Sequence, residues 1–107
     1  EEAAERCRDR LGRCIDSGDR QAEAAARLAL ADVHIAMDRH RESLREASRV
    51  LDLAKVASDR RLQAEAQQAC AAAHLKIGGS TAARAAGACV EQAQAILEEL
   101  RENRELV

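Results

Sequence analysis

Four cysteines and three histidines are the residues of this sequence that could hold a metal ion or form a redox pair. Cys7 and Cys14 lie about 10 Å apart along one predicted helix, whereas a disulfide needs Cα atoms within about 7 Å. The sequence has no Cys-x-x-Cys pair and no close Cys/His cluster, the spacing that zinc sites favour. We therefore predict no metal or other cofactor, and interpret the cysteines as buried, reduced thiols.

The sequence also lacks a recognisable catalytic set. It contains no nucleophile with an adjacent base, no phosphate-binding loop and no histidine-glutamate metal motif. The residues Gly78-Gly79-Ser80 precede a predicted helix, whose free N–H groups could bind an anion, but a simple turn is the favoured interpretation. The sequence thus predicts a protein that is not an enzyme.

The cysteines and histidines lie within a sequence that repeats after forty residues. Residues 19–37 align with residues 59–77 without a gap, so that Asp19-Arg20 falls on Asp59-Arg60 and His34 on His74. Such self-similarity is typical of repeat architectures. We expect the two equivalent histidines to be packed with one ring nitrogen hydrogen-bonded, and His40 to be solvated in a turn.

Composition and periodicity predict an all-α fold. The chain has 25 Ala and 11 Leu but no Pro, Phe, Trp or Tyr, and Ala and Leu are strong helix formers. Apolar residues recurring every three to four positions predict about five helices, in antiparallel hairpins stacked as a short right-handed α-solenoid. These helices are expected at residues 2–16, 20–37, 41–57, 60–77 and 81–104.

The predicted helices form a single domain, residues 1–107. It consists of a half repeat (1–17), a repeat (18–57) and a second repeat with a lengthened last helix (58–107). The last helix matches the third at an offset of 46 rather than 40, which indicates six inserted residues within 81–89.

Small and apolar residues at fixed places in each repeat carry a family resemblance. They are Leu30-Ala31, Asp38, Ser43, Ala54 and Ser58-Asp59, echoed by Cys70-Ala71, Gly78, Cys89 and Leu100. This pattern resembles tetratricopeptide repeats, in the forty-residue form of Pins-type adaptors and kinesin light chains, and those of bacterial regulators with helical-repeat tails. The chain departs from the family at Arg27, His34, His40 and Ala47, where bulky aromatic residues are usual.

The resemblance implies a module that binds a peptide or helix of a partner protein in a concave groove lined by the first helix of each repeat. The groove of this chain lacks the cluster of Lys, Arg and Asn with which chaperone-binding members of the family hold a C-terminal carboxylate. Binding of such C-terminal tails is therefore not expected. The groove positions carried over are Ala25, Leu28, Ala29, Asp32, Ile35 and Ala36, together with Glu65, Gln68, Ala69, Ala72, Leu75 and Lys76.

Charge and hydropathy limit the other kinds of partner. Seventeen basic and 19 acidic residues give a net charge of −2, which favours neither nucleic acid nor an anionic membrane. The stripe Arg41, Arg45 and Arg49 has Glu42 and Glu46 beside it and is interpreted as a solvated face. No apolar run approaches the roughly 18 residues of a membrane span, and we expect a cytoplasmic protein.

Two alternatives to a partner-binding adaptor module remain open. One is a regulatory segment of a larger multidomain regulator, which could form a homo-oligomer through exposed terminal helices. The half repeat at the start of the sequence favours this alternative. The other is a structural or designed repeat without a partner, which the missing aromatic residues permit.

Overall fold

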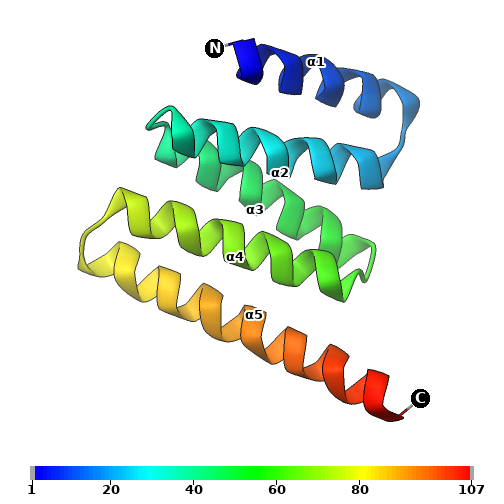
Figure 1. Cartoon of the computed structure of the whole chain (residues 1–107), viewed down its shortest axis with the longest axis vertical. Helices are drawn as coiled ribbons and strands as arrows, with labels where there is room; N and C mark the ends of the chain where they lie inside the picture. The colour runs from blue at the N-terminus through cyan, green and yellow to red at the C-terminus, as the bar shows by residue number, and fades with distance from the viewer. Residues whose placement is uncertain (1, 107) are drawn as a thin grey trace.

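The computed structural model describes residues 2–106, with side chains described through Asn103. Five helices make up this range, and it contains no strand (Figure 1). Each helix begins and ends within two residues of its predicted bounds, and the all-α fold is confirmed. They are α1 (Glu2–Ser17), α2 (Arg20–Ala36), α3 (His40–Val56), α4 (Arg60–Ile77) and α5 (Ser80–Leu106).

Repeated residues set the helix starts. Asp19 and Asp59 each accept a hydrogen bond on Oδ1 from the backbone N–H three residues later, at 3.1 Å, which satisfies a donor that a helix start otherwise leaves free. The preceding residues, Gly18 and Ser58, both have a left-handed backbone with φ of +75° and +54°. The forty-residue repeat is therefore visible in the turns.

Each helix packs against the next one, and α2 also contacts α4. In Figure 1 the chain forms a flat array in which α2 and α4 lie side by side and α3 joins them. The described Cα atoms span 44 × 39 × 18 Å. This arrangement is that of an all-α helical repeat; the right-handed turn of the solenoid stays a prediction.

The interior is built from small side chains. Ala47, Ala54 and Ala66 are completely buried. The largest completely buried side chains are those of Val50 and Ser43. A side chain of this size removes little apolar area from water, so the helix backbones must approach closely to gain contact. A second cluster joins α1 to α2 through Ala4, Leu11, Ala26 and Leu30.

The six inserted residues are helical and lengthen the beginning of α5. At 1.5 Å per residue they add about 9 Å to this helix, which runs beside α4 in Figure 1. The offset of 46 between α3 and α5 agrees with burial: Ala47 and Val50 are buried, and so are Ala93 and Ile96.

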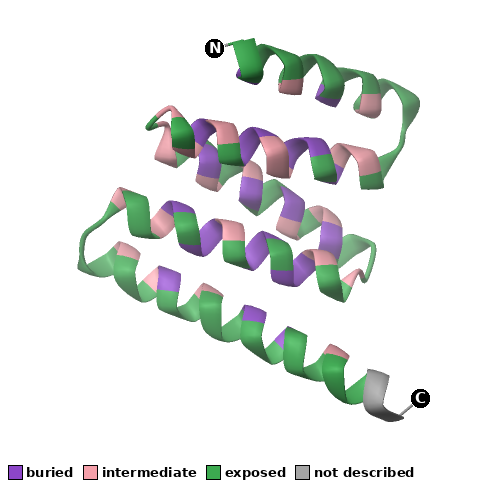
Figure 2. Ribbon diagram, viewed as in Figure 1, coloured by how far each residue is buried: buried purple, intermediate pink, exposed green. Residues whose placement is uncertain are grey.

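Three expectations about the reactive side chains are wrong or only partly correct. Of the cysteines only Cys70 is buried, and the other three are half-buried. In Figure 2 the buried residues gather on α2, α3 and α4, whereas α1 and α5 are mostly exposed. His40 is not a solvated turn residue, because it begins α3 and is half-buried. His34 is buried as expected, but its Nδ1 makes no hydrogen bond and instead lies 3.4 Å from a carboxylate oxygen of Glu42.

Candidate functional site

The predicted groove residues lie on α2 and α4, two helices that contact each other directly. We call these twelve positions the α2–α4 face. None of them is buried. Leu28, Ala29, Ile35 and Ala69 are half-buried, whereas Ala25, Asp32, Ala36, Glu65, Gln68, Ala72, Leu75 and Lys76 are exposed.

The structure adds three residues to this face that the sequence did not predict. A depression of about 350 Å³ between the beginnings of α2 and α4 brings Ala25, Leu28 and Glu65 together with new neighbours. The signal was available for Gln21 and Leu62, which lie four and three positions before Ala25 and Glu65 on the same sides of their helices. Asp59 reaches the depression as the N-cap residue of α4. The added residues are Gln21, Asp59 and Leu62.

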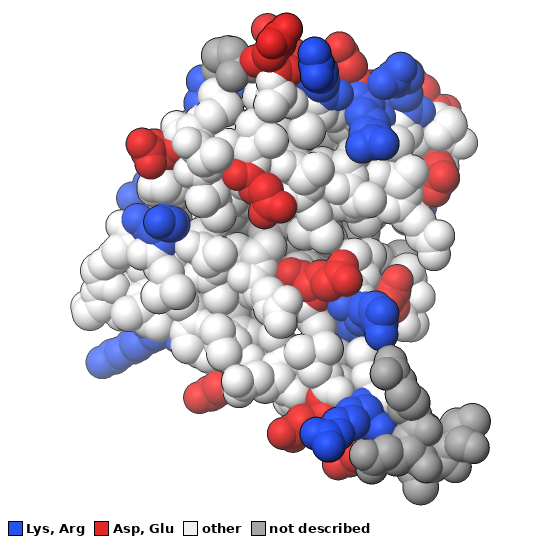
Figure 3. Space-filling view, viewed as in Figure 1, with Lys and Arg blue, Asp and Glu red and all other residues white. Residues whose placement is uncertain are grey.

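Charge on the α2–α4 face is sparse and mainly acidic. Asp32 and Glu65 are exposed, and Lys76 lies in the last turn of α4. Figure 3 shows the molecule in the orientation of Figure 1, with a surface over α2 and α4 that is largely uncharged and carries isolated acidic groups. Leu75 is 64% exposed, which gives this face an apolar contact point beside its alanines.

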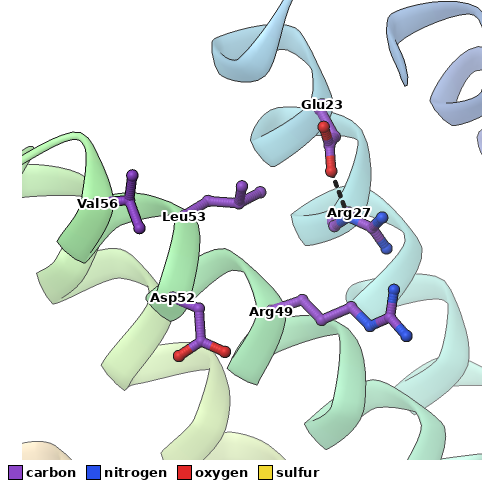
Figure 4. Close-up of a pocket in the computed structure, with 6 residues that line it drawn as sticks. All are labelled: Glu23, Arg27, Arg49, Asp52, Leu53 and Val56. Atoms are coloured by element: carbon purple, nitrogen blue, oxygen red, sulfur yellow. Dashed lines mark hydrogen bonds and ion pairs between the residues drawn. The ribbon is translucent and has the colours of Figure 1, made fainter. Parts of the chain in front are cut away.

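A second depression lies between α2 and α3 and is lined by charged residues (Figure 4). Its volume is about 290 Å³. Arg27, whose side chain is 9% exposed, donates from Nε to Glu23 at 3.1 Å and from Nη1 to Glu46 at 2.9 Å. Two carboxylates therefore hold this guanidinium in place, which suits a structural link between helices. Arg49 and Asp52 also line the depression.

The link from Arg27 to Glu46 has a neutral counterpart in the second repeat. Gln67 is the equivalent of Arg27 at the offset of 40, and Gln92 is the equivalent of Glu46 at the offset of 46. The Gln67 amide nitrogen donates to the Gln92 side-chain oxygen. Each hairpin thus has a polar bridge at this position. The second hairpin has a further link, because Arg60 of α4 pairs with Glu99 of α5 at 2.9 Å. Neither bridge was predicted from the sequence, although Arg27 and Gln67 are polar residues within alanine-rich stretches.

The four cysteines are distributed over α1, α4 and α5. Within the described residues, no group of three or more His, Cys, Asp or Glu side chains is placed to hold a metal ion. Burial raises the pKa of Cys70 to about 11, helped by the nearby Cys89 and opposed by a hydrogen bond with Ser48. Burial also raises the pKa of Cys89. A raised pKa lowers the thiolate fraction and makes a thiol unreactive.

We predict that Cys70 reacts slowest of the four cysteines with iodoacetamide at pH 8. A pKa of about 11 instead of 9.0 leaves about one hundredth of the ordinary thiolate fraction, and burial further limits access. Mass spectrometry of peptides after timed alkylation measures the order. In denaturant all four thiols should react at similar rates, and fast modification of Cys70 in the folded chain would contradict its burial beneath α5.

The fold defines a class, the all-α array of helix hairpins, and no described helix has the length and apolar composition to cross a membrane. Comparison of the chain with protein-family models, curated proteins and solved structures finds no match in any of the three.

Proposed function

We propose that this chain is a protein-binding module of the tetratricopeptide type, without catalytic activity. Its α2–α4 face would hold a helix of a partner protein that presents apolar residues flanked by basic ones. The observation that carries the proposal is the accessible, weakly charged surface formed by equivalent positions of two repeats.

The chemistry of the face favours this partner. Alanines such as Ala25, Ala29 and Ala72 allow another backbone to approach closely, and the exposed Leu75 offers apolar contact. Helices laid in grooves are recognised through apolar anchors on one side. Asp32 and Glu65 would attract basic groups that flank those anchors, and electrostatic complementarity of this kind mainly sets specificity and association rate.

The test uses two labelled amphipathic helical peptides with the same leucines, one flanked by lysines and one by glutamates. The chain should bind the lysine peptide, and Asp32→Lys/Glu65→Lys should reverse the preference. Exposed charge pairs contribute about 0.2–1 kcal/mol each, so replacing two attractions by two repulsions should weaken lysine-peptide binding about tenfold. Fluorescence anisotropy of the peptide measures this, since the chain has no Trp or Tyr.

The control is Asp9→Lys/Asp16→Lys, which changes the net charge equally on exposed positions of α1. It should leave the preference for the lysine peptide in place. If neither peptide binds, or if both variants change binding equally, the α2–α4 face is not the binding surface. Capture of partners from a lysate with the same variants would then follow as a search for the natural ligand.

A self-associating segment is the second candidate, and a specific observation favours it. Val90 and Leu97 on α5 are 39% and 43% exposed, at the end of the array opposite to α1 (Figure 1). Apolar side chains on a terminal helix of a repeat array are available to pair with another copy of the chain.

A further inference from the structure

A third depression lies between α1 and α3, with α2 beneath it, and has a volume of about 290 Å³. Within the described residues, α1 and α3 each pack on α2 but not on each other. The space between them therefore stays open, and α2 forms its floor. We call this space the α1–α3 depression. It shares no residue with the α2–α4 face, so what it binds is a separate question from the partner proposed above.

The floor of the α1–α3 depression contains a buried polar atom without a hydrogen bond. The side chain of His34 is 5% exposed and lines the depression, and its Nδ1 has no hydrogen-bond partner among the described residues. The only printed neighbour of this nitrogen is a carboxylate oxygen of Glu42, 3.4 Å away. Beside the imidazole the floor is apolar, formed by Leu11 and Leu30. An unsatisfied buried polar group destabilises a fold, so a ligand that accepts a hydrogen bond from Nδ1 would remove this cost.

Two arginines at the rim of the α1–α3 depression have no carboxylate partner. Arg8 of α1 and Arg45 of α3 both line it and are exposed, and neither forms an ion pair with another described residue. Glu46, which also lines the depression, is held by Arg27 at 2.9 Å. Both guanidiniums are therefore available to an anion from outside the chain, and the planar guanidinium matches the geometry of a carboxylate.

The second repeat shows which of these groups the stacking of helices requires. The histidine recurs there as His74. The arginines do not recur, because Ser48 stands in place of Arg8 at the offset of 40. In the same way, Glu91 stands in place of Arg45 at the offset of 46. The same arrangement of helices thus forms without the two cations, and packing does not account for their presence in the first repeat.

From the buried nitrogen, the two arginines and the apolar floor, we propose that the α1–α3 depression binds a small organic acid. The carboxylate of this ligand accepts hydrogen bonds from the guanidiniums of Arg8 and Arg45 and from Nδ1 of His34. Its short apolar chain lies on Leu11 and Leu30. The volume of about 290 Å³ is at the lower end of the range of about 300–1,000 Å³ for ligand pockets, which suits a ligand of a few carbon atoms.

Titration of the ¹⁵N-labelled full chain with hexanoate, followed by NMR of the imidazole nitrogens, tests the proposal. The signals of His34 should shift, whereas those of His74, the equivalent histidine without neighbouring arginines, should stay in place. Two further probes separate the parts of the ligand: hexanol has the apolar chain without the charge, and inorganic phosphate is an anion without an apolar chain. Each should bind at least about tenfold more weakly than hexanoate, because it lacks either the charge-assisted hydrogen bonds or the apolar contact.

Two double variants separate the α1–α3 depression from a general effect of charge. Arg8→Ser/Arg45→Glu gives the first repeat the residues of the second one and should weaken hexanoate binding at least about tenfold. Arg6→Ser/Arg61→Glu makes the same changes at exposed positions outside the depression and should bind like the wild type. Far-UV circular dichroism shows whether each variant is folded. Unchanged His34 signals in the wild type, an equal response to hexanol or phosphate, or full binding by Arg8→Ser/Arg45→Glu would overturn the proposal.

Discussion

Replacing Arg27 by Gln should lower the free energy of unfolding by about 2 kcal/mol. The change removes the cation that holds Glu23 and Glu46 and leaves two carboxylates, each 18% exposed, beside one another. Removing one partner of a fully buried ion pair costs about 3–5 kcal/mol, and partial exposure reduces this cost. Urea denaturation followed by circular dichroism measures the change.

The double variant Arg27→Gln/Glu46→Gln distinguishes a specific link from a general loss. It gives the first hairpin the amide pair that Gln67 and Gln92 form in the second one. We expect it to recover about 1 kcal/mol of the loss, within the range of coupling between contacting residues. Arg49→Gln, an exposed arginine of the same depression, should change stability by less than about 0.5 kcal/mol. A double variant less stable than Arg27→Gln alone would contradict the equivalence of the two bridges.

Ala66→Leu should lower the free energy of unfolding further than Arg27→Gln does, by about 3 kcal/mol. Ala66 of α4 is completely buried and lies in one cluster with Ala24 of α2 and Val50 of α3. A leucine there must push helices apart, and overpacking of a well-filled core costs about 1–3 kcal/mol. Because a chain of this size has a total stability of about 5–15 kcal/mol, the loss should be obvious in the urea midpoint.

The matched control for this substitution is Ala95→Leu on an exposed position of α5. Both residues are excellent helix formers, so the control should be nearly neutral. If Ala66→Leu were as stable as the wild type, the close approach of α2, α3 and α4 around Ala66 would be wrong.

The helices and their order were predictable from the sequence because local signals agreed with one another. Asp19 and Asp59 mark helix starts, Gly18 and Gly78 mark helix ends, and no proline or aromatic residue disturbs the alanine-rich stretches between them. The accessible positions of the α2–α4 face were also predictable, since the repeat specifies which side of each first helix points away from its neighbours. Whether that face binds a partner stays a prediction.

The polar bridges between helices were not predictable in the same way. The sequence of α2 alone gives no reason to expect that Arg27 is buried. Its partner Glu46 lies on the next helix and comes close to Arg27 in the folded chain. Burial of the cysteines was overestimated for a related reason. Cys7 and Cys14 lie on α1, which packs against α2 alone among the described helices. Positions that would be enclosed in a middle helix are therefore half-buried in α1.

The two bridges differ in charge, and this difference has a consequence for how the helices pair. α2 and α4 are equivalent helices of the repeat, so an exchange of their partners is the wrong arrangement to consider. If α2 met α5, the Arg27 guanidinium would face the neutral Gln92, and Glu46 would be left facing Gln67 without its cation. An unsatisfied charge of this kind destabilises the wrong arrangement. The difference between the two bridges thus favours the pairing of α2 with α3 and of α4 with α5 over the exchanged pairing.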